Sequence, residues 1–229
     1  MDQEKHTAAV TETTTKEFLL GEILTLSLLG RTFYAFPEPA WIDGLVKNDV
    51  FQDVPLAADH ADVRQGMALA RQWLDGRSSQ QAADILESDY IRLFVGGGRH
   101  ILAPPWESVY VSSEPLLLQR ETLEVRNWYA RYGLVAEKKG QEPDDHVGLE
   151  LEFVAHLAGL ALEALERGEQ TRFQEAMDAQ RAFLKEHVLR WVPTWATHVA
   201  QHAQTDFYRG CALMTRGLFQ VLAEALGVA

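Results

Sequence analysis

The chain has 229 residues, of which 47% are hydrophobic, and it carries a formal net charge of −12 and a single cysteine. This length and apolar content suit one globular domain, or two tightly fused halves, with a sizeable core. The negative charge disfavours nucleic-acid binding, which requires a basic face, and one cysteine excludes an intramolecular disulfide and a four-cysteine metal site.

The first sixteen residues are rich in threonine and charge, which predicts a mobile tail at 1–16 ahead of one domain at 17–229. The tail has no basic segment followed by an apolar run, as a secretory signal would. No part of the chain has the roughly 18 consecutive apolar residues that cross a bilayer. A lone cysteine is typical of a reducing compartment. We therefore expect a cytoplasmic protein without stable membrane insertion.

Apolar residues recur at helical spacing through most of the domain and predict an all-α fold. The predicted core-facing stripes are, in chain order, Leu20, Ile23, Leu24 and Ser27 or Leu28; Val63, Met67, Ala70 and Leu74; Val147, Leu151, Val154, Ala158, Ala161 and Leu165; Phe173, Met177, Gln180, Leu184, Val188 and Trp191; and Phe207, Cys211, Met214, Leu218, Leu222 and Ala225. Only "VYV" at 109–111 and "GLVAE" at 133–137 are compatible with strands.

Polar and glycine residues mark where helices begin and end. Ser78 and Gln81 have the spacing of a capping box, and Gly133 is placed to end the helix before it. The stretch "VGGGRH" at 95–100 lacks the Lys-Ser or Lys-Thr of a phosphate-binding loop. We interpret the Gly/Pro-rich region from Gly96 to Pro115 as a hinge loop that joins two subdomains of a single helical-bundle-like domain.

Two short stretches are candidates for function. "LAPPWESVYVSSEP", from Leu102 to Pro115, is more apolar and aromatic than an ordinary connector, so it is either a rigid turn or a contact surface. "EPDDHVG", from Glu142 to Gly148, carries acidic residues that favour the positive end of a helix dipole, with the proline in the first helical turn. A protonated His146 would oppose that dipole, so we expect it to be neutral or paired with Asp145.

The histidines and acids also allow enzyme interpretations. His198 and His202 have the i, i+4 spacing of a zinc protease, but Val199 replaces the general-base glutamate. The acids and histidines at 142–156 leave open a metal- or nucleotide-dependent helical enzyme or switch, although no matching Glu-x-x-His motif occurs elsewhere. Ser108 and Cys211 are the only tempting nucleophiles, and Cys211 lies on an apolar stripe as a small core residue would. We assign no catalytic residue, no metal and no cofactor.

Five stretches together resemble one family: "YIRLFVGGGRHILAPPWESVY", "TLEVRNWYARYGL", "EPDDHVGLELEFVAHLA", "FLKEHVLRWVPTW" and "TDFYRGCALMTRGLF". In this order they resemble the TorD/DmsD/NarJ group of cytoplasmic redox-enzyme maturation chaperones. "PPWESVY" and "EP-x-DH" at this separation are specific as a pair. The resemblance implies an all-helical chaperone, not an enzyme. It would bind the twin-arginine signal peptide and the apoprotein of a molybdenum-cofactor oxidoreductase until the cofactor is inserted.

The resemblance also implies a peptide-binding surface on this chain. Its residues would be Leu93, Phe94, Pro105, Trp106, Ser108, Tyr110, Glu142, Pro143, Asp145 and His146. An arginine pair followed by an apolar stretch requires carboxylates beside an aromatic groove, and the two stretches supply one kind each. The alternative is that Trp106 and Tyr110 only wedge the helical halves together. The partner would be a molybdoenzyme of the dimethyl-sulfoxide-reductase type, bound by a monomer or a domain-swapped dimer.

Overall fold

The computed structural model describes residues 2–96, 100–112, 120–136 and 142–228, with the side chains of residues 2–12 left out. The α-helices are α1 (Asp2–Tyr34), α2 (Pro39–Lys47), α3 (Ala61–Leu74), α4 (Ser79–Tyr90), α5 (Glu107–Val111), α6 (Arg120–Arg131), α7 (Val147–Glu166), α8 (Gln170–Phe183), α9 (Leu189–His202) and α10 (Asp206–Leu226). Two π-helical turns, Ile91–Val95 and Leu184–Val188, continue α4 and α8. No described residue lies in a strand, and "VYV" is part of α5. The all-α prediction is confirmed.

Helix α4 begins, and helix α6 ends, at the residues that the sequence predicts. At the start of α4, Gln81 N donates to Ser78 Oγ over 3.3 Å and Ser78 N donates to Gln81 Oε1, which forms the capping box. Gly133, just beyond α6, has a φ of +70°, a conformation that glycine adopts without strain. Both boundary predictions are confirmed.

Helix α1 differs from the sequence prediction in where it begins and in which face it buries. It begins at Asp2, so residues 2–16 are part of a helix that neither glycine nor proline interrupts before Gly21. The mobility of this segment stays a prediction. The predicted stripe is wrong: Leu20 and Leu24 are 48% and 60% exposed. The buried face instead carries Leu19, Glu22, Leu26, Leu29 and Phe33.

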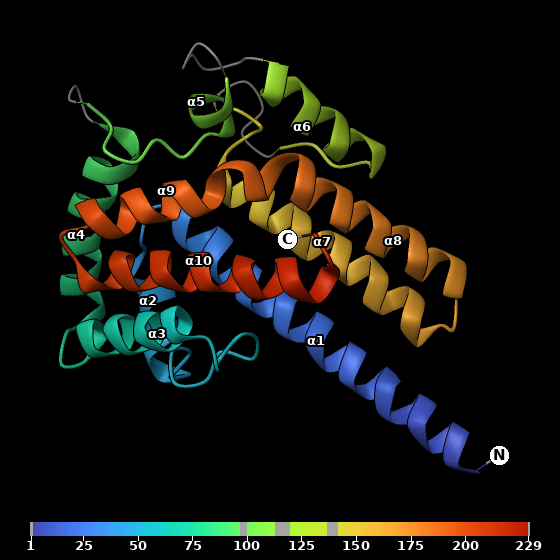
Figure 1. Ribbon diagram of the computed structural model, residues 1–229. Coiled ribbons are helices and arrows are strands. Elements are labelled where there is room, and N and C mark those ends of the chain that lie inside the picture. The colour runs from blue at the N-terminus through green and yellow to red at the C-terminus, as the bar shows by residue number, and fades with distance from the viewer. Residues whose placement is uncertain (1, 97–99, 113–119, 137–141, 229) are drawn as a thin grey trace.

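Two helix pairs make the most extensive contacts, α10 with α3 and α1 with α7 (Figure 1). Each pair crosses where glycines bring the backbones close. A Cβ on Gly66 or Gly210 would collide with the carbonyl oxygen of the other residue. A Cβ on Gly148 would lie 2.9 Å from the carbonyl oxygen of Gly30. These crossings fix the first and last helices against the middle of the chain.

Both pairings join helices from opposite sides of the proposed boundary near 96–115, because α1 and α3 precede it while α7 and α10 follow it. The helices of the two sides are therefore interleaved. Residues 97–99 and 113–115 of the predicted hinge lie outside the described residues, and Gly96 has a φ of +85°. The division into two subdomains stays a prediction.

Large aromatic side chains fill the centre of the molecule. Phe94 packs edge-on against Phe33 and Tyr208, with ring centroids 6.0 and 5.7 Å apart, and Phe33 is also edge-on to Trp195 at 4.8 Å. Cys211 is fully buried on α10, as the stripe predicts. Burial also raises the pKa of its thiol.

Candidate functional site

The two candidate stretches lie side by side, although about forty residues separate them in the sequence. Their backbones form an antiparallel bridge between Trp106 and His146. Val147 N donates to Pro105 O over 2.8 Å, and Glu107 N donates to Asp145 O over 3.0 Å. The pairing of "PPWESVY" with "EPDDH" is therefore a structural unit, made by the backbones of both.

Asp145 is the centre of this unit and is fully buried. Its Oδ2 accepts a hydrogen bond from Ser108 N at 2.9 Å, and its Oδ1 accepts one from Thr122 Oγ1 at 2.8 Å. One carboxylate thus connects α5, α6 and the loop before α7. Both oxygens already have protein donors, so Asp145 holds the site together from inside.

Helix α6 places one face against the loop at 142–146. Thr122, Arg126 and Tyr129, at i, i+4 and i+7, all reach the acidic pair. Arg126 donates through Nε and Nη2 to Asp144 Oδ2, at 2.9 and 2.6 Å. The Tyr129 hydroxyl donates to Asp144 O at 3.1 Å. No sequence pattern indicates this contact between α6 and the loop.

His146 is the N-cap of α7. The helix begins at Val147, so the expectation that Pro143 and the acidic pair form its first turn is wrong. Gly148 N donates to His146 Nδ1 at 3.0 Å, which requires an unprotonated Nδ1 and hence the neutral ring. The Tyr34 and Trp106 rings lie edge-on to it, at centroid distances of 5.2 and 6.3 Å. Capping explains why a histidine is tolerated at this helix start.

Four of the predicted site residues are half-buried and reach the surface: Trp106, Tyr110, Glu142 and Pro143. Trp106 Nε1 donates to Glu142 Oε1 over 2.7 Å. The Tyr110 ring lies 5.4 Å from the Trp191 ring and 5.7 Å from that of His198. An indole and a carboxylate, one from each stretch, are thus joined at the accessible side of the unit.

The remaining predicted site residues are buried: Leu93, Phe94, Pro105, Ser108, Asp145 and His146. Ala103 N donates to Leu93 O at 2.9 Å, which fixes the approach to the proline pair, while Phe94 belongs to the aromatic centre. The ten residues therefore do not form one open surface. The four half-buried residues reach the surface, and the six buried residues lie beneath it.

The candidate stretches lie within the part of the chain that a known family matches. The family model described as nitrate reductase delta subunit matches residues 56–197, more than half of the chain. This chain belongs to that family.

Similar proteins agree with the TorD/DmsD/NarJ resemblance, which is confirmed. The chaperone protein TorD of Vibrio cholerae serotype O1 is 29% identical over 144 residues, which cover 63% of each chain. The Haemophilus influenzae protein named a probable Tat proofreading chaperone, DmsD, is 26% identical over 192 residues, 82% of this chain and 83% of that one. A crystal structure from Archaeoglobus fulgidus, described as a redox enzyme maturation protein, has the same fold, with a TM-score of 0.50, 17% identity, and coverage of 88% and 93%.

Beneath the site, this family member carries buried ionisable residues that the sequence does not predict to lie together. Glu107 and Glu150 are fully buried, and His187 is 3% exposed. Trp191 Nε1 donates to Glu150 Oε2 at 2.9 Å. Burial, and next the nearby Glu107 carboxyl, raise the pKa of Glu150 well above its usual range, and burial also raises the pKa of Glu107. Spacing could not reveal this cluster, because its members come from α5, α7 and a π-helical turn.

The acids and histidines at 142–156 do not converge as metal ligands would. His146 caps α7, Glu150 faces Trp191, and Glu152 accepts a hydrogen bond from Ser27 of α1. His156 stacks on Phe153, with ring centroids 6.4 Å apart. Within the described ranges, no three His, Cys, Asp or Glu residues are grouped to hold a metal ion.

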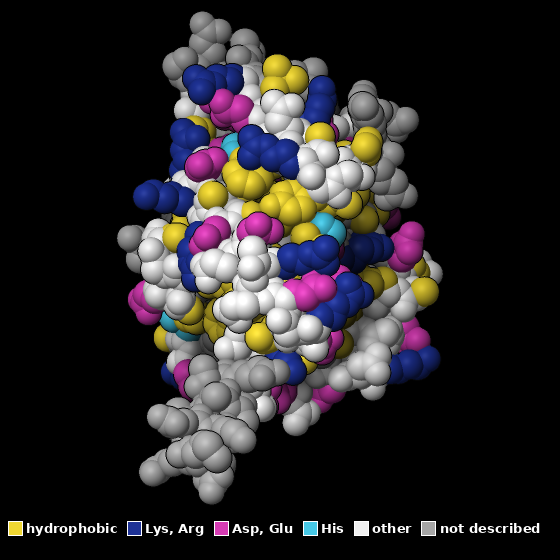
Figure 2. Space-filling view, turned by 90° about the vertical axis from the view of Figure 1, so that its right-hand side faces the viewer, with side chains coloured by type: hydrophobic (Ala, Val, Ile, Leu, Met, Phe, Trp, Pro, Cys, Tyr) yellow, Lys and Arg dark blue, Asp and Glu magenta, His cyan; other side chains and the backbone are white. Residues whose placement is uncertain are grey.

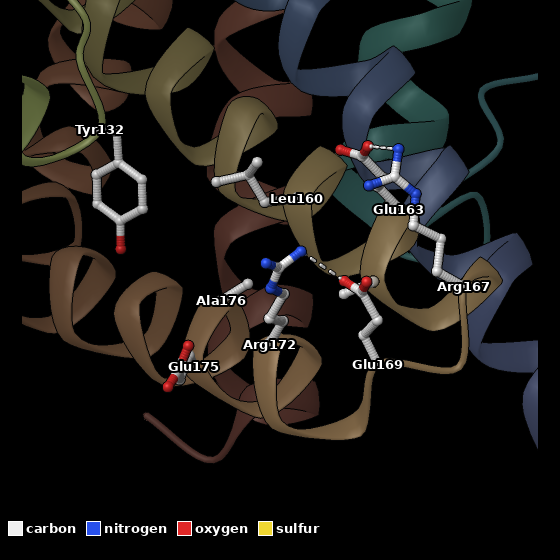
Figure 3. A pocket seen from close by; sticks show the side chains of 9 residues that line it. Tyr132, Leu160, Glu163, Arg167, Glu169, Arg172, Glu175 and Ala176 are labelled. Atoms are coloured by element: carbon white, nitrogen blue, oxygen red, sulfur yellow. Dashed lines mark hydrogen bonds and ion pairs between the residues drawn. The ribbon is translucent and has the colours of Figure 1, made fainter.

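Two cavities lie along α7. One, of about 370 Å³, lies between α7 and α8, and its arginines are paired: Arg167 with Glu163 at 2.5 Å and Arg172 with Glu169 at 2.9 Å (Figure 3). The other, of about 250 Å³, is lined by Leu134, Val135, Ala136, Leu149 and Phe153, among others. Figure 2 shows the face at the right of Figure 1, where hydrophobic side chains gather in its upper half among charges of both signs.

No helix in the described part of the chain is both long enough and apolar enough to span a bilayer.

Proposed function

We propose that this chain is a redox-enzyme maturation chaperone that binds the twin-arginine signal peptide and apoprotein of a molybdenum-cofactor oxidoreductase in the cytoplasm before cofactor insertion and export. The names of its relatives, TorD and DmsD chaperones, support a chaperone rather than an enzyme. The alignment with the TorD relative covers 63% of that protein, less than two thirds of its length.

The observation that carries the proposal is the hydrogen bond between Trp106 and Glu142 at the accessible side of the paired stretches. An indole offers a large apolar contact area at low entropic cost, and a carboxylate offers charge-assisted acceptance for a guanidinium. A peptide with an arginine pair beside an apolar segment requires both features next to each other. The net charge of −12 favours the approach of such a cationic peptide.

Peptide titration tests the proposal. A synthetic peptide with two adjacent arginines and a leucine-rich segment should bind the wild-type chain, and Glu142→Gln should weaken binding by about 1–2 kcal/mol and flatten its salt dependence. Trp106→Phe should weaken binding while leaving the salt dependence unchanged, because it removes apolar area. Glu169→Gln, in the cavity between α7 and α8, is the control. Absence of binding by the wild-type chain would reject the proposal.

A further inference from the structure

Asp144 occupies the variable position x of the "EP-x-DH" motif, and its carboxylate binds the guanidinium of Arg126. Arg126 reaches it from α6, and the two side chains are unequal in exposure: Arg126 is 40% exposed and Asp144 is 5% exposed. The carboxylate is therefore held in the protein, while the arginine lies at the surface. Solvent can therefore reach Arg126 while the Asp144 side chain stays buried.

The geometry of this ion pair leaves part of the carboxylate unused. Both Arg126 nitrogens donate to Oδ2, and among the described residues no donor is bonded to Oδ1. A bidentate pair, in which each nitrogen bonds its own oxygen, is the stronger arrangement for arginine and a carboxylate. Arg126 is partly exposed, so solvent screens its side of the pair, whereas the buried Asp144 carboxylate is costly to leave without a cation. Arg126 can therefore leave Asp144 when another guanidinium takes its place.

The neighbouring carboxylates do not offer the same exchange. Asp145 has a donor on each oxygen and no exposed surface, and Glu142 accepts from Trp106. Asp144, unlike Asp145, has a guanidinium as its partner. The loop therefore already displays the interaction that an arginine of a client would make.

We propose that Arg126 is an internal placeholder: a client arginine displaces it from Asp144 and pairs with this carboxylate, so that the Arg126–Asp144 pair sets the affinity and the arginine preference of the site. This inference rests on the proposed function, in which Glu142 accepts one arginine of the pair, and it adds Asp144 as the acceptor of the other. Asp144 was not among the residues that the family resemblance implied. The exchange needs no rearrangement of Asp145, so the buried unit stays intact.

The test is calorimetric titration of the twin-arginine peptide into matched variants. Arg126→Gln removes the competitor and should bind about three- to fivefold more tightly than wild type. Arg120→Gln removes the same charge from the same helix, at a side chain that is 84% exposed and paired with Glu124, and should stay within about twofold of wild type. Asp144→Asn should weaken binding about tenfold, and adding Arg126→Gln to it should give no gain.

Each alternative has its own result. Equal gains for Arg126→Gln and Arg120→Gln would show a general charge effect and overturn the inference. Unchanged or weaker binding by Arg126→Gln, with a lowered melting temperature, would make the pair structural and also overturn it. Binding of a twin-lysine peptide checks the arginine preference: its gain from Arg126→Gln should be smaller. If wild type binds neither peptide, the proposed function fails; if it binds and Arg126→Gln does not improve, only this inference fails.

Discussion

Glu107 and His187 form a buried pair, with Glu107 Oε2 2.8 Å from His187 Nδ1 and exposed fractions of 0% and 3%. Glu107 directly follows Trp106 on α5, and His187 lies in the π-helical turn before α9. Arg190 Nη1 lies 3.8 Å from the second oxygen of Glu107. The pair therefore fastens the tryptophan segment to the last third of the chain, independently of Asp145.

Replacing His187 should destabilise the fold strongly. His187→Ala leaves the Glu107 carboxyl buried without its main partner, which should lower the free energy of unfolding by about 3 kcal/mol. Chemical denaturation measures this loss. His156→Ala, which removes a half-buried histidine that stacks on Phe153, should cost distinctly less. Equal losses for the two variants would show that the buried pair contributes nothing beyond packing.

Asp145→Asn should lower the stability of the fold, and its effect on peptide binding should follow from that loss. The asparagine side chain has one acceptor oxygen for two donors, Ser108 N and Thr122 Oγ1. A buried donor without its acceptor costs about 1–3 kcal/mol, which a thermal melt will show. Asp178→Asn, at a side chain that is 63% exposed, should leave the melting temperature nearly unchanged. A stable Asp145→Asn protein that fails to bind peptide would instead place Asp145 in direct contact with the client.

The glycine crossing of α3 and α10 predicts opposite effects for two glycine-to-alanine substitutions. Gly210→Ala forces a methyl group against the Gly66 carbonyl and should cost about 1–3 kcal/mol. Gly159, inside α7, has open space at its Cβ position, so Gly159→Ala should stabilise the fold by about 0.5–1 kcal/mol. Denaturant melts of both variants decide the matter, and a loss of stability in Gly159→Ala would contradict the second expectation.

Glu22 makes stability depend on pH. Burial on α1 raises its pKa from the usual 4.5 to about 8, although Gln180 Nε2 donates to it at 2.6 Å. The folded state then keeps a proton that the unfolded state releases above pH 4.5, so stability falls as the pH rises from about 4.5 to about 8. Glu22→Gln should remove this fall and add on the order of 3 kcal/mol at pH 8, but nothing below pH 4. Glu17→Gln, at an exposed position of α1, should keep the wild-type slope.

The helices of α3 and α7 to α10 could be predicted because apolar residues occupy one face of each. All four residues of the Val63–Leu74 stripe are buried. Prediction failed on α1, where adjacent leucines at 19–20 and 28–29 give two possible stripes and the buried face includes an acid. Periodicity measures spacing, and it cannot choose between two equally spaced faces.

The sequence identified residues of the candidate site, but it did not predict how their side chains lie. The motif pair identified Trp106 and Glu142, which do meet. The acids of "EPDDH" suggested exposed charge, yet the structure buries Asp145 because Ser108 and Thr122, 37 and 23 residues away, supply donors. Such partners satisfy a buried carboxylate only in the folded chain. No local pattern signals them.

Because α3 packs most extensively on α10, the apolar face of residues 61–74 lacks its main partner on a nascent chain until residues 206–226 have been synthesised. Helix α1 likewise lacks its main partner until α7 has been synthesised. Contacts between distant segments slow folding, and apolar surface exposed in the meantime promotes association. This protein, itself proposed to shield unfinished enzymes, therefore completes its own core only late in its synthesis.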